Sequence, residues 1–195
     1  GTSGSQQVGF ATNLTQHAAL WNGTAASHVD LHPAGSTFSA AIATNGTTQV
    51  GVAHGFTAIP TVRASMWSGT ADSWVDLSPA GSSESYANAV SGNMQGGYTL
   101  FFPFINAGIW QGTSESWTNL HPNAGPGIDN SAIYGMAGSQ QVGVTSGFAN
   151  FTARAALWTG TAESYVDLAP AGAIESVANA TDGTHQVGYA RFGVN

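Results

Sequence analysis

The chain has 195 residues, a length that suits one domain or one compact array of repeats. Only 7% of the residues are charged, against about 25% in ordinary soluble domains, and three arginines are the only strongly basic residues. With a net charge of −7 the chain would repel a phosphate backbone, which excludes nucleic acid as a partner and disfavours anionic membranes.

The composition still allows a folded core, because 42% of the residues are hydrophobic and aromatic residues are frequent. The chain has no cysteine, which excludes disulfides and thiolate metal sites. Among its six histidines one pair, His28 and His32, has the spacing His-x-x-x-His, but no histidine is paired with a cysteine, and we expect no metal and no cofactor. No run of about 20 apolar residues occurs, and we expect no membrane insertion.

The predicted elements, taken in chain order, recur with a period of about 46 residues. The first unit contains four short strands, at 6–12, 17–21, 27–31 and 38–44, with Gly, Pro, Asn and Ser between them. The same pattern returns around Trp67, Trp110 and Trp158, which follow Trp21 at intervals of 46, 43 and 48 residues. The units span about 5–47, 48–93, 94–139 and 140–184, and an extra Gln-Val-Gly strand follows at 185–195.

Turn residues recur at fixed places in each unit. A glycine lies two positions after each of these tryptophans, where we expect a positive φ between the second and third strands. A proline follows each third strand and prevents its extension. No segment has a sustained apolar period of 3.6 residues, so we expect almost no helix.

Four-stranded antiparallel units of this length are typical of β-propeller blades, which bury their faces by stacking on their neighbours. We therefore predict an all-β fold, a four-bladed β-propeller built from four four-stranded repeats. The small side chains of the fourth strands would lie at the crowded centre, and the Trp and Leu side chains would fill the space between blades. An open β-solenoid is the alternative, although its coils usually repeat at shorter periods.

The order of motifs resembles a known bacterial family, the HAF-type extracellular repeats. Those repeats join a Gln-Val-Val-Gly strand, a His-Ala-Phe-Leu-Trp strand and a Thr-Asp-Leu segment, and the likeness covers all four units. His17 keeps the histidine of the motif, whereas Arg63, Asn106 and Arg154 replace it elsewhere. The resemblance implies a secreted, propeller-like protein and implies no catalytic residues.

The third strand of each unit carries the candidate ligand site. Strand alternation places Val29 and Leu31 on one face, and an aromatic ring and an acid or amide on the other. Such a pair can stack on a sugar and accept hydrogen bonds from its hydroxyl groups. The structural alternative is that the acid bonds to the following turn while the ring covers a strand. The glycan-binding candidates are His28 with Asp30, Trp74 with Asp76, Trp117 with Asn119, and Tyr165 with Asp167.

Two further groups have a structural and a functional interpretation. The four motif tryptophans could be sugar platforms, but packing between blades explains their recurrence better. Glu84 and Glu175 occupy the same place in two fourth strands, and paired carboxylates can hydrolyse glycosides. Solvated positions at the rim explain these two glutamates more simply, so we predict no catalytic residues.

The surplus strand and the apolar third unit suggest self-assembly. There are five Gln-Val-Gly strands and four of every other kind, so one terminal strand either closes the ring or pairs with another molecule. The self-assembly candidates are Val8, Phe10, Phe101, Phe102, Phe104, Val187 and Tyr189.

Together these patterns predict a non-enzymatic extracellular module, secreted or at the cell surface, that is glycan-binding or structural. Its partners would be a glycan or other copies of itself. The alternatives are a self-assembling subunit of an extracellular filament or surface layer and, ranked lower, a glycan-active enzyme.

Overall fold

The computed structural model describes residues 1–56, 61–123, 127–148 and 152–193, which are almost entirely β-structure. This confirms the predicted all-β class. The strands form five antiparallel sheets, and the only helical segments in these ranges are four 3-10 turns of three residues each. None of these turns is long or apolar enough to cross a membrane. The last two residues of the predicted extra strand, 194–195, lie outside the described residues.

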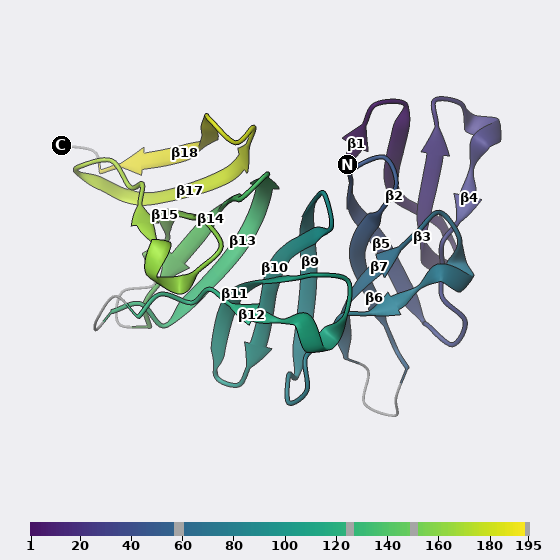
Figure 1. The fold of residues 1–195 in the computed structure, drawn as a ribbon, viewed down its shortest axis with the longest axis horizontal. Coiled ribbons are helices and arrows are strands. Elements are labelled where there is room, and N and C mark those ends of the chain that lie inside the picture. Colours follow the sequence, from purple (N-terminus) through teal and green to yellow (C-terminus); the bar gives the residue numbers. More distant parts are fainter. Residues whose placement is uncertain (57–60, 124–126, 149–151, 194–195) are drawn as a thin grey trace.

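The sheets are numbered 1 to 5 in chain order (Figure 1). Sheet 1 contains β1 (Thr2–Ser3), β2 (Gln6–Asn13), β3 (Thr15–Asn22) and β4 (Val29–Asp30). Sheet 2 contains β5 (Phe38–Thr44), β6 (Gln49–His54), β7 (Val62–Trp67) and β8 (Val75–Asp76). Sheet 3 contains β9 (Glu84–Ser91), β10 (Met94–Phe101), β11 (Phe104–Trp110) and β12 (Thr118–Asn119). Sheet 4 contains β13 (Asn130–Ala137), β14 (Gln140–Ser146), β15 (Arg154–Trp158) and β16 (Val166–Asp167). Sheet 5 contains β17 (Ala173–Thr181) and β18 (Gln186–Phe192).

Sheets 2, 3 and 4 begin with the fourth strand of one sequence unit, the small-residue strand (β5, β9 or β13), and continue with the first three strands of the next unit. The Gln-Val-Gly strand pairs with that first strand and with the Trp strand, and the Val-Asp strand lies at the outer edge. This last strand has only two residues because a 3-10 turn, such as η2 (Ala71–Ser73), precedes it. The glycines between the Trp strand and this turn have φ from 78° to 91°, as predicted (Gly23, Gly69, Gly112 and Gly160).

In sheets 2 to 5 the glycine of the Gln-Val-Gly strand lies against a β-bulge in the first strand. A Cβ atom on Gly143 would lie 1.9 Å from the carbonyl oxygen of Ala132, and one on Gly51 would lie 2.0 Å from that of Ala40. The register shifts at the same places, between Ile133 and Gly135 in sheet 4. The motif therefore needs glycine because the two backbones approach too closely for any side chain.

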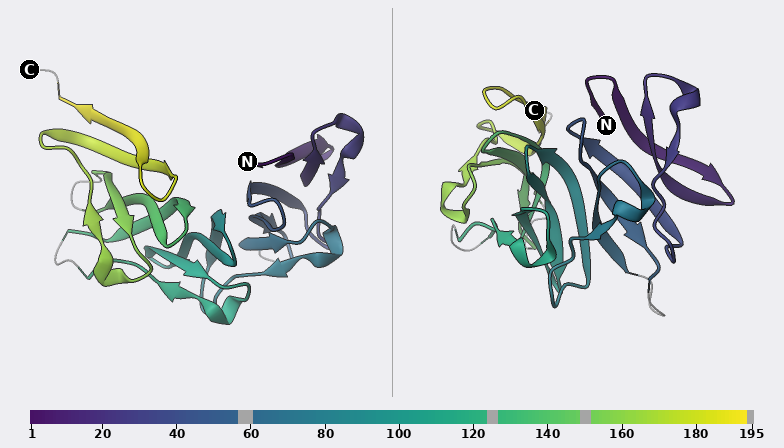
Figure 2. Two further views of the ribbon diagram at one scale, coloured as in Figure 1. Left: turned by 45° about the horizontal axis from the view of Figure 1, so that its top comes forward. Right: turned by 45° about the vertical axis from the view of Figure 1, so that its right-hand side comes forward.

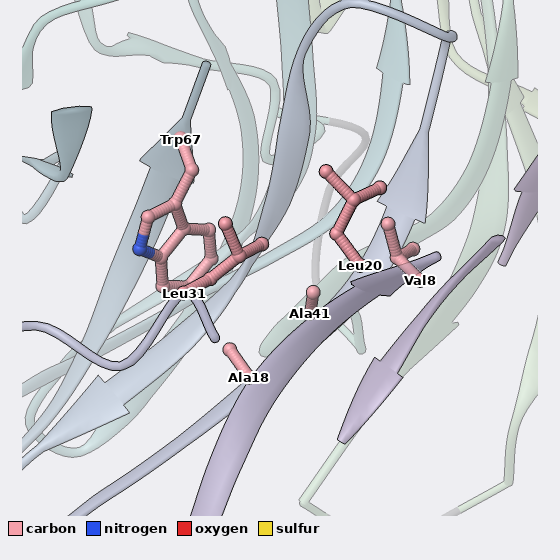
Figure 3. Close-up of a cluster of buried hydrophobic side chains, with 6 residues drawn as sticks. All are labelled: Val8, Ala18, Leu20, Leu31, Ala41 and Trp67. Atoms are coloured by element: carbon pink, nitrogen blue, oxygen red, sulfur yellow. The ribbon is translucent and has the colours of Figure 1, made fainter. Parts of the chain in front are cut away.

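Consecutive sheets pack face to face, and a tryptophan closes each of the first three interfaces. Trp67 of sheet 2 packs on Ala18, Leu20 and Leu31 of sheet 1 (Figure 3). Trp110 and Trp158 close the next two interfaces in the same way, and all three indole rings are fully buried. Their N–H groups have no hydrogen-bond partner in the described part of the chain, so packing alone holds the rings. The predicted packing role of these three tryptophans is confirmed.

Serines of the small-residue strands fasten the same interfaces through hydrogen bonds. The backbone N–H of Ala18 in sheet 1 donates to Ser39 Oγ in sheet 2, at 2.8 Å. The bond recurs between each sheet and the next, from Ala64 to Ser85, from Ala107 to Ser131 and from Ala155 to Ser176, each at 2.9 Å. The small residues are thus required between the sheets, where the backbones approach closely.

The five sheets follow one another along an open arc (Figures 1 and 2). Sheet 1 and sheet 5 form its two ends, and their strands do not pack extensively against each other in the described ranges. The expectation of four blades differs from this arrangement in one respect. The surplus strand β18 pairs with β17 and starts a fifth sheet, and it does not pair with sheet 1.

Candidate functional site

The acids of the third strands are held by partners within their own sheet. Oδ2 of Asp30 lies 2.8 Å from His17 Nδ1, and its Oδ1 accepts a hydrogen bond of 2.8 Å from the backbone N–H of His32. Asp76 pairs in the same way with Arg63 and with the N–H of Ser78, at 2.9 Å from the latter.

Sheets 4 and 3 repeat the arrangement. Asp167 accepts from Arg154 Nε at 2.7 Å and from the N–H of Ala169 at 2.8 Å. In sheet 3, Asn119 keeps only the bond to the following turn, which His121 N–H donates at 2.8 Å. The structural alternative considered for these positions, a bond to the following turn, is therefore present in sheets 1 to 4. Hydroxyl groups of a sugar would compete with these bonds.

Burial alone would raise the pKa of Asp30. The hydrogen bonds from His17 and from the backbone of His32 outweigh that effect and hold the pKa below its ordinary value. The carboxylate thus stays ionised and bound to its neighbours at neutral pH.

A sequence signal for these pairs existed and was missed. The basic or amide residue at the start of each Trp strand precedes the acid or amide by 13 residues in all four units. The pairs are His17 with Asp30, Arg63 with Asp76, Asn106 with Asn119, and Arg154 with Asp167. Where the acid becomes an amide, the basic residue does so too, which is the pattern of two side chains facing each other across adjacent strands.

The aromatic residues of the glycan-binding candidates lie in the sheet interfaces. Trp74 packs beside the cluster around Trp67, and its indole N–H donates to Ser65 Oγ at 2.9 Å. Trp117 lies 4.5 Å from the ring of Trp110, and Tyr165 lies 5.9 Å from that of Trp158. Trp74 also stacks on the ring of Phe56, with the ring centroids 4.6 Å apart, so all three rings pack against other side chains. The ligand role of these residues stays a prediction.

His28 differs from its three equivalents because, among the described residues, no other sheet covers its face of sheet 1. Its ring lies 5.4 Å from that of Trp21, and His28 is exposed. Trp21 is itself partly exposed, unlike the three buried tryptophans. The face of sheet 1 that carries Trp21 and His28 is therefore an exposed aromatic surface, whereas the equivalent faces of sheets 2, 3 and 4 are covered by a neighbouring sheet.

A tyrosine groove, formed by Tyr86, Tyr98 and Tyr134, lies between sheets 3 and 4 and was not predicted. The rings of Tyr86 and Tyr98 stack at 4.6 Å with an angle of 18° between their planes, and Tyr86 donates to Glu84 at 3.1 Å. Tyr98 and Tyr134 line a hollow of about 180 Å³ together with Asn130. Burial, chiefly, raises the pKa of Tyr98 to about 12, so its hydroxyl group remains a hydrogen-bond donor across the physiological range.

The two glutamates at equivalent places have separate surroundings. Glu84 belongs to the tyrosine groove. Glu175 pairs with Arg191 at 2.8 Å and accepts from Tyr189 at 2.7 Å. Each carboxylate is thus engaged by neighbours within its own sheet.

Two equivalent histidines link a sheet to the start of the next. His32 Nδ1 lies 2.8 Å from Ser39 Oγ, and His121 Nδ1 lies 2.8 Å from Ser131 Oγ. Burial is the largest influence on both and lowers the pKa of each. Among the described residues, no three His, Asp or Glu side chains come together in a group that could hold a metal ion.

The self-assembly candidates lie in three places. Val8 is buried between sheets 1 and 2, which removes it from any surface. Phe10 is exposed on β2, Phe102 is 86% exposed at the β10–β11 turn, and Phe104 beside it is partly covered by Phe148. The remaining candidates are Phe101 in the same hairpin, and Val187 and Tyr189 on β18.

A central depression of about 300 Å³ lies where the first strands of the sheets converge. It is lined by the start of the chain and by residues of β5, β9, β13 and β17, among them Asn88, Tyr134 and Asn179. The first strands therefore take the inner positions in the arc, and the Val-Asp strands the outer ones.

Comparisons with known proteins add no neighbour: no family model, no curated protein and no solved structure matches this chain. The resemblance to HAF-type repeats therefore remains a prediction from the motifs.

Proposed function

We propose that the chain is a non-enzymatic structural module of the cell surface or the extracellular space. One observation carries this proposal: the side chains that recur in every unit are used to hold sheets together. The tryptophans fill interfaces, the serines accept hydrogen bonds from the preceding sheet, and the acids fix the turns. Recurrence of this kind serves the architecture, which leaves the variable positions for partners.

The extracellular location is inferred from the resemblance to HAF-type repeats alone. The closed four-bladed ring also stays a prediction. It would need β17 and β18 to join β3 and β4 of the same chain in place of β1 and β2.

Localisation in the source cells tests the proposal. We expect an antibody against the chain to find it in the medium or at the surface of intact cells, where added protease removes it. A cytoplasmic protease-resistant pool as the sole location would contradict the proposal. A cytoplasmic marker protein, measured in the same samples, controls for lysis.

Glycan binding is a second candidate function, favoured by the tyrosine groove. The rings of Tyr98 and Tyr134 and the amide of Asn130 line one small hollow, which suits a single sugar residue with apolar C–H and polar hydroxyl groups. Tyr86, which is bonded to Glu84, stacks on Tyr98. Enzymatic cleavage ranks lower, because Glu84 and Glu175 each bond to groups of their own sheet.

A glycan array distinguishes the two possible glycan sites. If the groove binds, Tyr98→Ala should lower the signal at least tenfold, whereas Asp76→Asn and Phe102→Ala should leave it unchanged. Loss of signal in Asp76→Asn alone would transfer the site to the third strands. No signal on any glycan would leave the structural role as the whole function.

A further inference from the structure

We propose that two stacked histidines, His17 and His32, form an acid-sensitive clasp between sheets 1 and 2. Uptake of a proton by His32 loosens the connection from β4 to β5, together with the hydrogen bond that joins the two sheets beside it. The clasp is a regulatory device of the fold, and it is compatible with both the structural role and glycan binding.

The two histidine rings lie parallel and in contact. Their centroids are 3.7 Å apart, and the angle between their planes is 6°. His17 belongs to β3, whereas His32 lies in the segment that follows β4, so the stack joins two parts of sheet 1. Two neutral rings can stack in this way, but a positive charge on one ring disfavours a positive charge on the other.

The hydrogen bonds of His32 determine where the neutral ring carries its hydrogen. Nε2 lies 3.0 Å from the carbonyl oxygen of Ser36, which can only accept, so the hydrogen is on Nε2. Nδ1 is then an acceptor, and it takes the hydroxyl hydrogen of Ser39, whose Oγ lies 2.8 Å away. The same Oγ accepts from the backbone N–H of Ala18 at 2.8 Å, which is the bond between sheet 1 and sheet 2.

A proton added to Nδ1 of His32 is incompatible with this arrangement. Nδ1 would direct its new hydrogen at Ser39 Oγ, and the hydroxyl hydrogen of Ser39 would lose its acceptor. Ser39 is fully buried, so water cannot replace the lost partner. An open state in which His32 is hydrated accepts the proton more readily, and acid therefore shifts the population towards that state.

The charged groups around His32 come chiefly from sheet 1. Burial is the largest influence and lowers the pKa of His32; the charge that His17 can carry lowers it further, whereas the bond to the carbonyl oxygen and the charge of Asp30 raise it. Asp30 is itself bound to His17, with 2.8 Å between Oδ2 and Nδ1. From sheet 2, His54 lies beside the same connection, and its ring packs edge-on against Phe38.

The next two interfaces contain the same bond between sheets without the histidine pair. Between sheets 2 and 3, Ser85 Oγ accepts from the N–H of Ala64 at 2.9 Å and lies 2.8 Å from Ser78 Oγ, so this chain of hydrogen bonds contains no titratable group. Between sheets 3 and 4 a histidine is present, His121, but Asn106 takes the place of the stacking histidine. Of these three interfaces, the first alone has both histidines.

Amide hydrogen exchange of the wild-type protein tests the clasp, because the N–H groups of Ala18 and Ala64 make equivalent bonds in the first and second interfaces. Exchange is followed by NMR from about pH 7.5 to about pH 5 and divided by the intrinsic rate at each pH. We expect the protection of Ala18 to fall about tenfold further than that of Ala64 over this range. Equal falls at the two amides, or no fall at Ala18, would overturn the proposal.

Two substitutions separate the roles of the histidines. His32→Ser introduces the pair of hydroxyl groups that the second interface already uses, so the protection of Ala18 should then follow that of Ala64 at every pH. His17→Asn keeps His32 and removes the stacked ring, and it should reduce the acid response without abolishing it. A response in His32→Ser equal to that of the wild type would refute the clasp.

His28→Ser is the matched control, because it removes an exposed histidine of the same sheet and should leave the acid response unchanged. A response reduced as much by His28→Ser as by His32→Ser would assign it to the overall charge of sheet 1 and refute the clasp. If a variant fails to fold, the comparison of the two amides within the wild-type protein still decides the question.

Discussion

The glycine of the Gln-Val-Gly strand provides the sharpest test of the fold. In sheet 4, a Cβ on Gly143 would lie 1.9 Å from Ala132 O and 3.0 Å from Ile133 Cα, both backbone atoms. An ordinary C···O contact is about 3.3 Å, so the strands would have to separate by about 1.4 Å. That movement would weaken about two ladder hydrogen bonds, worth about 1 kcal/mol each, and add strain of about 1–3 kcal/mol. We therefore expect Gly143→Ala to lower the free energy of unfolding by about 3–5 kcal/mol.

Gly9 is the matched control for this substitution. It occupies the same place in sheet 1, but β1 ends before reaching it, and the nearest atom to an added Cβ is a ring carbon of Trp21 at 3.8 Å. Gly9→Ala should be neutral or stabilise by up to about 1 kcal/mol, because alanine restricts the unfolded chain. Urea denaturation followed by tryptophan fluorescence measures both. If the two variants were equally stable, the close approach at the bulge would be refuted.

The remaining predictions concern the interfaces and the turns. Trp110→Ala should lower the free energy of unfolding by about 3–5 kcal/mol, and Trp21→Ala by clearly less, because of the two only Trp110 is fully buried. Urea denaturation of dilute protein compares the two variants, and equal losses would contradict the packing of Trp110 in a sheet interface. Stability should fall as the pH drops below about 6.5. The pKa values of His32 and His121 are lowered in the folded protein, so the unfolded chain binds protons first as the pH falls. A double variant, His32→Ser with His121→Ser, should lose much of this pH dependence in thermal melting curves. Asp76→Asn should cost less stability than Asp76→Ala, since only the amide can still accept from the following turn, and thermal melting would expose a reversed order.

Much of the local structure was predictable because it depends on short spacings. The alternation of Val8 and Phe10, the glycines after each tryptophan and the prolines after each third strand defined most strands and turns correctly. The third strand predicted at 27–31 was too long, because a 3-10 turn at Ala25–Ser27 leaves only Val29–Asp30 as strand. The recurrence of Trp67, Trp110 and Trp158 indicated residues that fill a repeated interface. Local steric limits and apolar periodicity act within a few residues, so a single sequence contains them.

The candidate site was predicted less well, because contacts between sheets decide it. The acids were expected to face a ligand, but His17, Arg63 and Arg154 hold them, and a strand partner 13 residues away is invisible to alternation within one strand. The tyrosine groove joins rings from β9, β10 and β13, whose positions share no spacing in the sequence.

The sequence by itself determined the repeat, the β class and the residues at which backbones must approach closely, since each of these depends on near neighbours along the chain. Only the tertiary structure decided which strands share a sheet. The small-residue strand ends one sequence unit but pairs with the Gln-Val-Gly strand of the next unit, so the boundaries of the sheets differ from those of the units. The tertiary structure also decided that β18 pairs with β17 in a fifth sheet, which leaves Val187 exposed. Pairing between distant strands depends on how faces are covered, and this is settled only when all sheets are packed together.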